Sequence, residues 1–230
     1  MNLPLPFTSA LRRWLGHIAA RPNARPTVLI KELRERDRRR ILKHFLALES
    51  ADRVLRFGGL LPDEQVTAYV NKIDFSRDVV YGVYNNVFKL TAVGHLAFAP
   101  KETSPLKAAT AKERVAEFGV SVLSDARGMG VGSKMFERAA VHCRNNDVDT
   151  LYMHCLSSNQ TMMHIAKKAG MRIERDYGEA DAYLRLPPPN PSSVLQEAVE
   201  EQFATLDYTF KANTRAAAKW MDRLSGRKRN

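Results

Sequence analysis

Cysteine is scarce in this 230-residue chain, which contains only Cys143 and Cys155. Two cysteines cannot build a disulfide framework and are too few for a zinc site of their own. The histidines His17, His44 and His95 are scattered without the spacing of metal ligands. We therefore expect a cytoplasmic protein from a reducing compartment, with two buried core thiols and no bound metal.

Long apolar runs are missing too. None approaches the roughly 18 residues that a membrane-spanning helix needs, so we expect no membrane span. Residues 1–31 lack Asp and Glu, and this composition fits a mitochondrial transit peptide. A secretory signal is not expected, because Arg12 and Arg13 would interrupt its apolar core. Apolar residues at helical spacing favour instead a short helix that docks on the protein. These residues are Leu11, Trp14, Leu15 and Ile18.

Acidic residues are outnumbered, because 36 Lys and Arg stand against 25 Asp and Glu and give a formal net charge of +11. Such a surface attracts polyanions, which include nucleotides, nucleic acids and acidic membranes. Arginines at 34–40 and a basic end at 227–229 make nucleic-acid binding an alternative. Glu35 and Asp37 interrupt the first segment, however, and no recognition motif of a nucleic-acid-binding module is present. We therefore do not favour nucleic acid as the partner.

Prolines divide the chain into three parts. Pro22 and Pro26 end the first helix, and three prolines at 187–189 precede a long amphipathic segment. We expect an N-terminal helical extension, a central α/β domain and a C-terminal helical extension with a basic end. These parts cover residues 1–26, 27–186 and 187–230.

The central part alternates between helical and strand periodicity. Asp37 is placed to cap the first of its helices. Asn85 and Asn86 are expected to form a tight hairpin, because asparagine accepts the positive φ of such a turn. A second turn is expected at Gly178. The predicted strands cover 27–33, 79–84, 88–98, 114–123, 150–156, 171–174 and 182–186, and the predicted helices cover 37–57, 62–73, 131–145 and 160–169.

The C-terminal segment is predicted to be one long helix with a single apolar face. Leaving such a face in water is costly, so we expect it to pack on the domain or on a second copy of the chain, which would be a homodimer. The face consists of Leu195, Val199, Phe203, Leu206 and Phe210.

A glycine-rich turn at 127–132 joins a predicted strand to a predicted helix. This arrangement points unpaired backbone N–H groups at one spot, where the helix dipole also favours a phosphate. The dinucleotide-binding pattern fails, because Ser133 stands where its third glycine belongs. The P-loop pattern fails as well. It needs a glycine immediately before Lys134, where this chain has Ser133, and Met135 stands where Ser or Thr would bind magnesium.

The pattern Arg127-x-x-Gly130-x-Gly132, which follows the strand at 116–124, resembles the acetyl-CoA loop of the GNAT N-acetyltransferase superfamily. The resemblance extends to Asn159 and to a Lys-Ala-Gly-Met segment at 168–171. With the element order, it covers about 160 residues of the central part.

This resemblance implies an α/β (α+β) fold, in which a mixed, mostly antiparallel sheet splays around acyl-CoA between its fourth and fifth strands and is flanked by helices. Val122 and Leu123 would offer backbone groups to the pantetheine arm, and Asn159 would bond the pantetheine side. The pyrophosphate would lie on the loop, which comprises Arg127, Gly128, Met129, Gly130, Val131, Gly132 and Ser133.

The resemblance also implies a general base, Glu117, whose alternative role is that of a structural, ion-paired carboxylate. Many family members place a tyrosine as general acid where this chain has Ala166. The proton for the departing CoA thiolate could come instead from His164, Tyr152 or Tyr177. Otherwise the thiolate leaves without a general acid.

The implied activity is acetyl-CoA-dependent N-acetyl transfer to a primary amine by direct attack. The acceptor stays open among small molecules, peptides and protein lysines. The alternative is a non-catalytic module that binds acyl-CoA.

Overall fold

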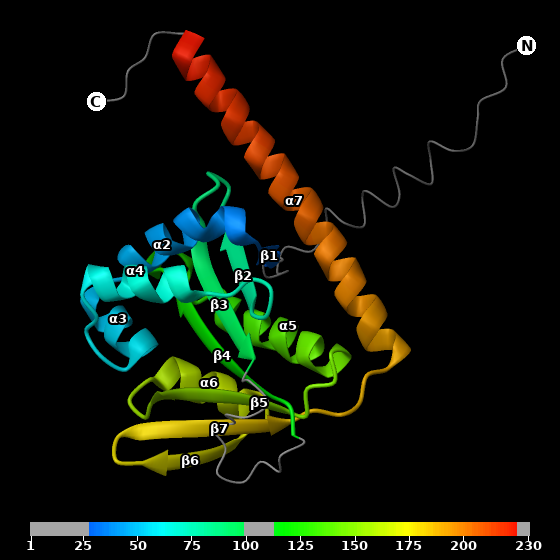
Figure 1. Cartoon of the computed structure of the whole chain (residues 1–230). Coiled ribbons are helices and arrows are strands. Elements are labelled where there is room, and N and C mark those ends of the chain that lie inside the picture. Colours follow the sequence, from blue (N-terminus) through cyan, green and yellow to red (C-terminus); the bar gives the residue numbers. More distant parts are fainter. Residues whose placement is uncertain (1–27, 99–112, 225–230) are drawn as a thin grey trace, which may run out of the picture.

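A seven-stranded sheet organises the computed structural model, which describes residues 28–98 and 113–224 (Figure 1). The strand order is β1-β2-β3-β4-β5-β7-β6, and all neighbours are antiparallel except β4 and β5. The strands are β1 (Lys31–Leu33), β2 (Val79–Tyr84), β3 (Leu90–Phe98), β4 (Val115–Val122), β5 (Thr150–Leu156), β6 (Arg172–Asp176) and β7 (Glu179–Arg185). The expected mixed sheet is therefore confirmed.

Helices cover both faces of the sheet, and each face has its own core (Figure 1). Because neighbouring residues of a strand point to opposite faces, Ala92 and Leu96 join the core under α5 and α6, whereas Val93 joins the core under α2 and α4. The helices are α2 (Arg38–Leu46), α3 (Ser50–Phe57), α4 (Asp63–Lys72), α5 (Val131–Asn145), α6 (Gln160–Lys168) and α7 (Pro191–Leu224). No helix of the described residues is long and apolar enough to cross a membrane.

The prediction of a single helix at 37–57 is wrong, because this segment forms two helices, α2 and α3. The chain leaves α2 at Ala47, buries Leu48 in the core and begins α3 after Glu49, whose backbone is extended. Asp37 does not cap α2 through its side chain. Its buried carboxylate instead accepts a hydrogen bond from Arg40 at 2.7 Å.

The hairpin between β2 and β3 differs from the prediction of a tight asparagine turn. The positive φ, 58°, belongs to Phe88, and β3 begins only at Leu90. Asn85 closes the loop, since its side-chain oxygen and its backbone N–H both bond to the backbone of Lys89. The side chain of Phe88 is buried against Tyr84, which explains why an aromatic residue occupies this conformation.

The long helix α7 lies along the domain beside α5 and β1, but it docks through its polar side. Glu197 accepts a hydrogen bond from His142 at 2.7 Å, and Lys31 forms an ion pair with Glu201. The predicted apolar face points away from the domain and is exposed. The expectation that this face packs on the domain is therefore wrong for the described residues. The N-terminal helix, the loop at 100–111 and the basic C-terminal end lie outside those residues.

Leucine truncation tests where the core lies. Leu151 of β5 is fully buried, whereas Leu60, in the loop before α4, is 64% exposed. Leu151→Ala leaves a cavity and should lower the free energy of unfolding by about 2–5 kcal/mol, and Leu60→Ala should change it by less than about 0.5 kcal/mol. Urea denaturation of both variants measures this difference. Equal effects would contradict the core assignment.

Candidate active site

Strands β4 and β5 separate after only three paired residues. Pairing ends at Glu117 and Tyr152, although β4 continues to Val122 and β5 to Leu156. Beyond that point the facing edges of the two strands have no ladder between them. Among the described strands this is also the parallel pair, and its divergence opens a fork in the sheet.

Every second residue of β4 directs its backbone N–H and C=O groups into this fork. The register pairs Val122 with Ala92, and the N–H of Leu123 donates to the carbonyl of Thr91 at 2.9 Å. In an antiparallel pair this pattern directs the N–H and C=O groups of Val120 and Val122 away from β3, toward β5. The backbone of Leu123 is already engaged, because its carbonyl also accepts a bond from Ala126. Val120, which was not among the predicted residues, therefore has backbone groups that face the fork, whereas those of Leu123 are engaged.

The glycine-rich loop lies at the wide end of the fork. Gly128 and Gly130 adopt left-handed conformations, with φ of 75° and 73°, and α5 begins directly after Gly130. The first intrahelical bond runs from the N–H of Lys134 to the carbonyl of Gly130, so the preceding amides of the first turn have no partner within the helix. The helix N-terminus and these amides together form a site that favours an anion.

A cleft of about 990 Å³ extends from this loop along the fork. It runs between α3, β4, the loop and α6, so elements far apart in the sequence form its walls. It includes every predicted cofactor-binding residue except Leu123, whose side chain is buried in the core under α2 and α4. The predicted residues that line it are Val122, Arg127, Gly128, Met129, Gly130, Val131, Gly132, Ser133 and Asn159.

Two predicted side chains are held by α3. Arg127 forms an ion pair with Asp52 and donates its Nε–H to the carbonyl of Val122 at 3.1 Å. Asn159 caps α6, because its Oδ1 accepts the N–H of Met162 at 3.1 Å, and its Nδ2 donates to the carbonyl of Leu55 at 3.3 Å. The first turn of α6 and the last turn of α3 are thereby tied together beside the cleft.

Glu117 is exposed at the apex of the fork and forms no ion pair with a described residue, which does not support a structural ion-pair role. Tyr152 lies opposite Glu117 on β5 and donates its hydroxyl to Asp181 at 2.7 Å. Burial, the bond to Asp181 and nearby negative charges raise the pKa of Tyr152, which keeps its hydroxyl protonated. His154 bonds the same carboxylate at 2.8 Å. No sequence pattern points to Asp181, because its partners come from another strand.

Arg56 is a second residue that the sequence did not indicate. Its guanidinium lies against Gly119 of β4, where an added Cβ would approach the guanidinium carbon to 3.0 Å. It donates to the hydroxyl of Tyr69 at 2.7 Å, and that hydroxyl bonds His95, which contacts Asp78. Three aromatic rings surround the guanidinium, at 5.1–5.6 Å from its carbon to their centroids. This arrangement holds a cation in the cleft wall beside the fork.

The expected general acid has no obvious substitute on α6. Ala166 is buried in the core, and the exposed His164 lines the cleft at its edge. Tyr177 is fully exposed in the turn between β6 and β7. Tyr152 already donates to Asp181.

Both cysteines are free and buried, as expected, and burial raises the pKa of the Cys143 and Cys155 thiols. Residues 28–98 and 113–224 hold no group of three or more His, Cys, Asp or Glu side chains arranged for a metal ion.

Comparison with known proteins agrees with this geometry. Residues 67–171 match the model of the acetyltransferase (GNAT) family. That segment contains β4, the glycine-rich loop, α5 and α6. No curated protein is significantly similar to the chain in sequence.

Solved structures show the same fold at low sequence identity. The GNAT domain of S. lividans PAT is 18% identical, with a TM-score of 0.56 over 68% of this chain and 89% of that one. An N-acetyltransferase from Staphylococcus aureus Mu50 is 15% identical, with a TM-score of 0.52 over 70% and 99%. Arabidopsis thaliana NAA60, in complex with a bisubstrate analogue, is 11% identical, with a TM-score of 0.54 over 71% and 100%. The resemblance and the expected fold are therefore confirmed.

Behind Ser121 of the cleft wall lies a buried histidine with a strongly perturbed pKa. His44 of α2 is buried, bonds the hydroxyl of Ser121 at 2.8 Å through Nε2 and contacts the carbonyl of Leu90 through Nδ1. Burial, with the nearby charges of Arg56 and Lys89, lowers the pKa of His44 to about 4. The neutral imidazole therefore joins α2 to β4.

This pKa makes stability depend on pH. Between pH 4 and 6.5 the unfolded chain binds a proton at His44 that the folded chain does not, so stability falls as the pH is lowered through this window, by up to about 3 kcal/mol. His44→Gln should reduce this pH dependence, whereas the same change at the exposed His164 should not. Urea denaturation at pH 7 and pH 5 measures the effect. An unchanged pH dependence in His44→Gln would contradict it.

Proposed function

Because the chain carries an acetyltransferase domain of the GNAT family, we propose that it transfers the acetyl group of acetyl-CoA to a primary amine that attacks the thioester directly. One observation carries the proposal: amides without a partner among the described residues lie at the wide end of a fork, and its apex holds a carboxylate that forms no ion pair with the described part of the chain. The first feature suits a diphosphate, and the second suits the proton of an attacking amine.

The cleft suits the shape and charge of acetyl-CoA. The pyrophosphate would lie on the amides of Gly128–Ser133, where the left-handed glycines turn the backbone toward the ligand, whereas the amide of Arg127 donates to the carbonyl of Ser124 at 3.3 Å. The pantetheine arm would run between the separated strands and bond the N–H and C=O of Val120 and the N–H of Val122, whose carbonyl already accepts from Arg127. Asn159 borders this path, and its Nδ2 would exchange the carbonyl of Leu55 for the ligand.

The base is needed because an alkyl ammonium has a pKa of about 10.4 and its nitrogen must be neutral to attack. Glu117 would accept this proton directly or through one water molecule. The amine nitrogen then forms a bond to the carbonyl carbon, the bond from that carbon to sulfur breaks, and the electron pair leaves on the CoA thiolate. The nitrogen loses its second proton to solvent, which in turn protonates the thiolate. The products are an amide and free CoA.

Departure of the thiolate needs little help. A thiol with a pKa of about 8.5 is a good leaving group near neutral pH, so solvent can protonate it after it leaves. This agrees with Ala166 standing at the usual tyrosine position, where no proton can be donated.

The acceptor would approach Glu117 from the face that carries Tyr152, His154 and Asp181. Small molecules, peptide N-termini and protein lysines all present the required amine. The relative from Arabidopsis binds a bisubstrate analogue, and direct attack in this chain would likewise bring both substrates into the cleft together. The two free, buried cysteines support a reducing compartment such as the cytoplasm.

A second candidate function is acyl-CoA binding without catalysis. Ala166, together with the buried Met162 and Met163, favours it, because α6 offers no acid on its inner side. The two candidates share the phosphate site and differ only in turnover. Release of free thiol from acetyl-CoA across a library of amines separates them.

Gly130→Asp tests the phosphate site. The new carboxylate would lie beside the diphosphate, and we expect the affinity for acetyl-CoA to fall by roughly 100-fold or more. Gly170→Asp is the matched control, because Gly170 has nearly the same φ, 71°, at the far end of α6. Isothermal titration calorimetry measures both variants. Equal affinities of the two variants would contradict the site.

Glu117→Gln tests the base. We expect kcat/KM for the best amine to fall by about 10²–10⁴, the affinity for acetyl-CoA to stay unchanged, and the acidic limb of the pH–rate profile to disappear. Glu64→Gln, on the exposed first turn of α4, is the control and should retain full activity. Full activity of Glu117→Gln would show that the carboxylate does not act as the general base. Binding of acetyl-CoA without turnover on any amine would support the non-catalytic candidate.

A further inference from the structure

Helix α7 exposes an apolar stripe that the rest of the described chain leaves uncovered. The exposed fractions of Leu195, Phe203, Leu206, Phe210 and Trp220 are 65, 60, 67, 70 and 62%. Eight large apolar side chains on one helix exceed the scattered surface residues of an ordinary monomer and mark an interaction surface. The full set comprises Val194, Leu195, Val199, Phe203, Leu206, Phe210, Trp220 and Met221.

The helix cannot turn this stripe toward its own domain, because its opposite side is already docked. Ala204 is buried there, and Tyr208 packs edge-on against Tyr84 and Phe88. Arg138 of α5, itself buried, faces Glu197, Glu200 and Glu201 at 3.5–3.8 Å. The polar side therefore fixes the helix, and the apolar side is presented outward.

The outward residues follow the heptad spacing of a coiled coil. From Val199 onward they alternate by four and three positions, which keeps one face of a helix against another helix over long distances. Such a stripe suits a helical partner of equal length better than a flat surface. The positions are Val199, Phe203, Leu206, Phe210, Asn213, Ala217 and Trp220.

We propose that this face binds α7 of a second copy of the chain in antiparallel orientation. Charge selects the orientation. Positions 191–207 contain four acidic residues and no Lys or Arg, whereas positions 208–224 contain Lys211, Arg215, Lys219 and Arg223 and one acidic residue. Glu197, Glu200 and Glu201 face Arg138 of their own domain, and Asp207 pairs with Lys211, but the side chain of Glu200 stays 43% exposed. Antiparallel helices place Glu200 toward the basic C-terminal part of the second copy, where Lys219 and Arg223 are exposed. Parallel helices would instead bring the two basic C-terminal parts together.

A two-fold axis near position 208 brings the stripes into register. Leu206 then meets Phe210 of the second copy, Val199 meets Ala217, and Leu195 meets Met221. The small side chains of three alanines at 216–218 allow the helices to approach closely where the partner's residues are larger.

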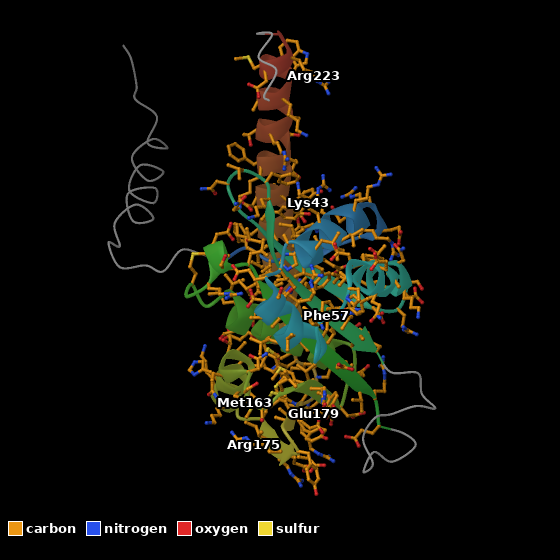
Figure 2. All side chains as sticks on the ribbon, turned by 90° about the vertical axis from the view of Figure 1, so that its left-hand side faces the viewer. Lys43, Phe57, Met163, Arg175, Glu179 and Arg223 are labelled. Atoms are coloured by element: carbon orange, nitrogen blue, oxygen red, sulfur yellow. The ribbon has the colours of Figure 1, made fainter. Side chains whose placement is uncertain are left out.

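The arrangement has room for both domains. The 34-residue helix is about 51 Å long, and its C-terminal part, which carries Arg223, projects past the domain (Figures 1 and 2). Each domain docks on the side of its helix opposite to the stripe, so the two domains lie on the outside of the helix pair.

Sedimentation velocity over a wide range of concentrations tests the dimer. The full chain should sediment with twice the mass of one chain, and Leu206→Glu with Phe210→Glu should sediment as a monomer. Ala198→Glu with Thr205→Glu is the matched control, because both positions are exposed but lie off the heptad seam, and it should remain a dimer. Both double variants should bind acetyl-CoA as the unaltered chain does, which shows that they fold.

Cysteine cross-linking tests the orientation. Leu195→Cys with Met221→Cys should form a covalent dimer on mild oxidation, because each cysteine meets the other one of the second copy. The two positions lie about 39 Å apart in one helix, so they cannot bond within one chain. Leu195→Cys alone should not cross-link, and the buried Cys143 and Cys155 of the unaltered chain give the background.

Three results would overturn the proposal. A monomer at all concentrations would exclude a second copy as the occupant, including the case in which the chain binds lipid vesicles or another protein through this face. A dimer that survives the two glutamates of the stripe would use another surface. Efficient cross-linking of Leu195→Cys alone would show parallel helices.

Discussion

The separation of β4 from β5 is the constraint on which the site depends. A parallel pair that continued in register would bond every backbone group of its facing edges and leave nothing for a ligand. Here the ladder stops at Glu117 and Tyr152, and the chain leaves β4 through a glycine-rich turn directly into α5. The fork supplies free strand groups, the turn supplies free amides, and the base stands where the two strands begin to part.

Most of this site consists of backbone groups, so ligand binding does not depend on particular side chains. An anion held by amides depends on left-handed turns and a helix start rather than on a particular residue. The loop arginine, Arg127, is engaged with Asp52 of α3, and Asn159 ties the same helix to α6. Helix α3 thus closes one side of the cleft through polar contacts. The absence of a tyrosine at Ala166 affects only the departure of the thiolate, which is the chemically easier step.

The sequence predicted what is local and missed what is assembled from distant elements. The glycine-rich turn, its flanking strand and helix, and the elements from β2 to β7 were predictable, because periodicity and turn residues act over a few positions. Arg56 and Asp181 were not, since their partners come from other elements. Nor did the sequence show that the backbone of Leu123 is engaged, because pairing with β3 decides which strand groups are free. For α7 the apolar pattern predicted a helix correctly, but the ion pairs of Glu197 and Glu201 decide which side docks.

A crystal structure of the full chain with CoA would locate the diphosphate and the pantetheine arm. We expect diphosphate oxygens at about 2.7–3.2 Å from the backbone nitrogens of the glycine-rich loop and of the first turn of α5, with the pantetheine arm between β4 and β5 and its sulfur toward Glu117. Density for the diphosphate at any other place, or a β4–β5 gap closed by the protein itself in the complex, would contradict it.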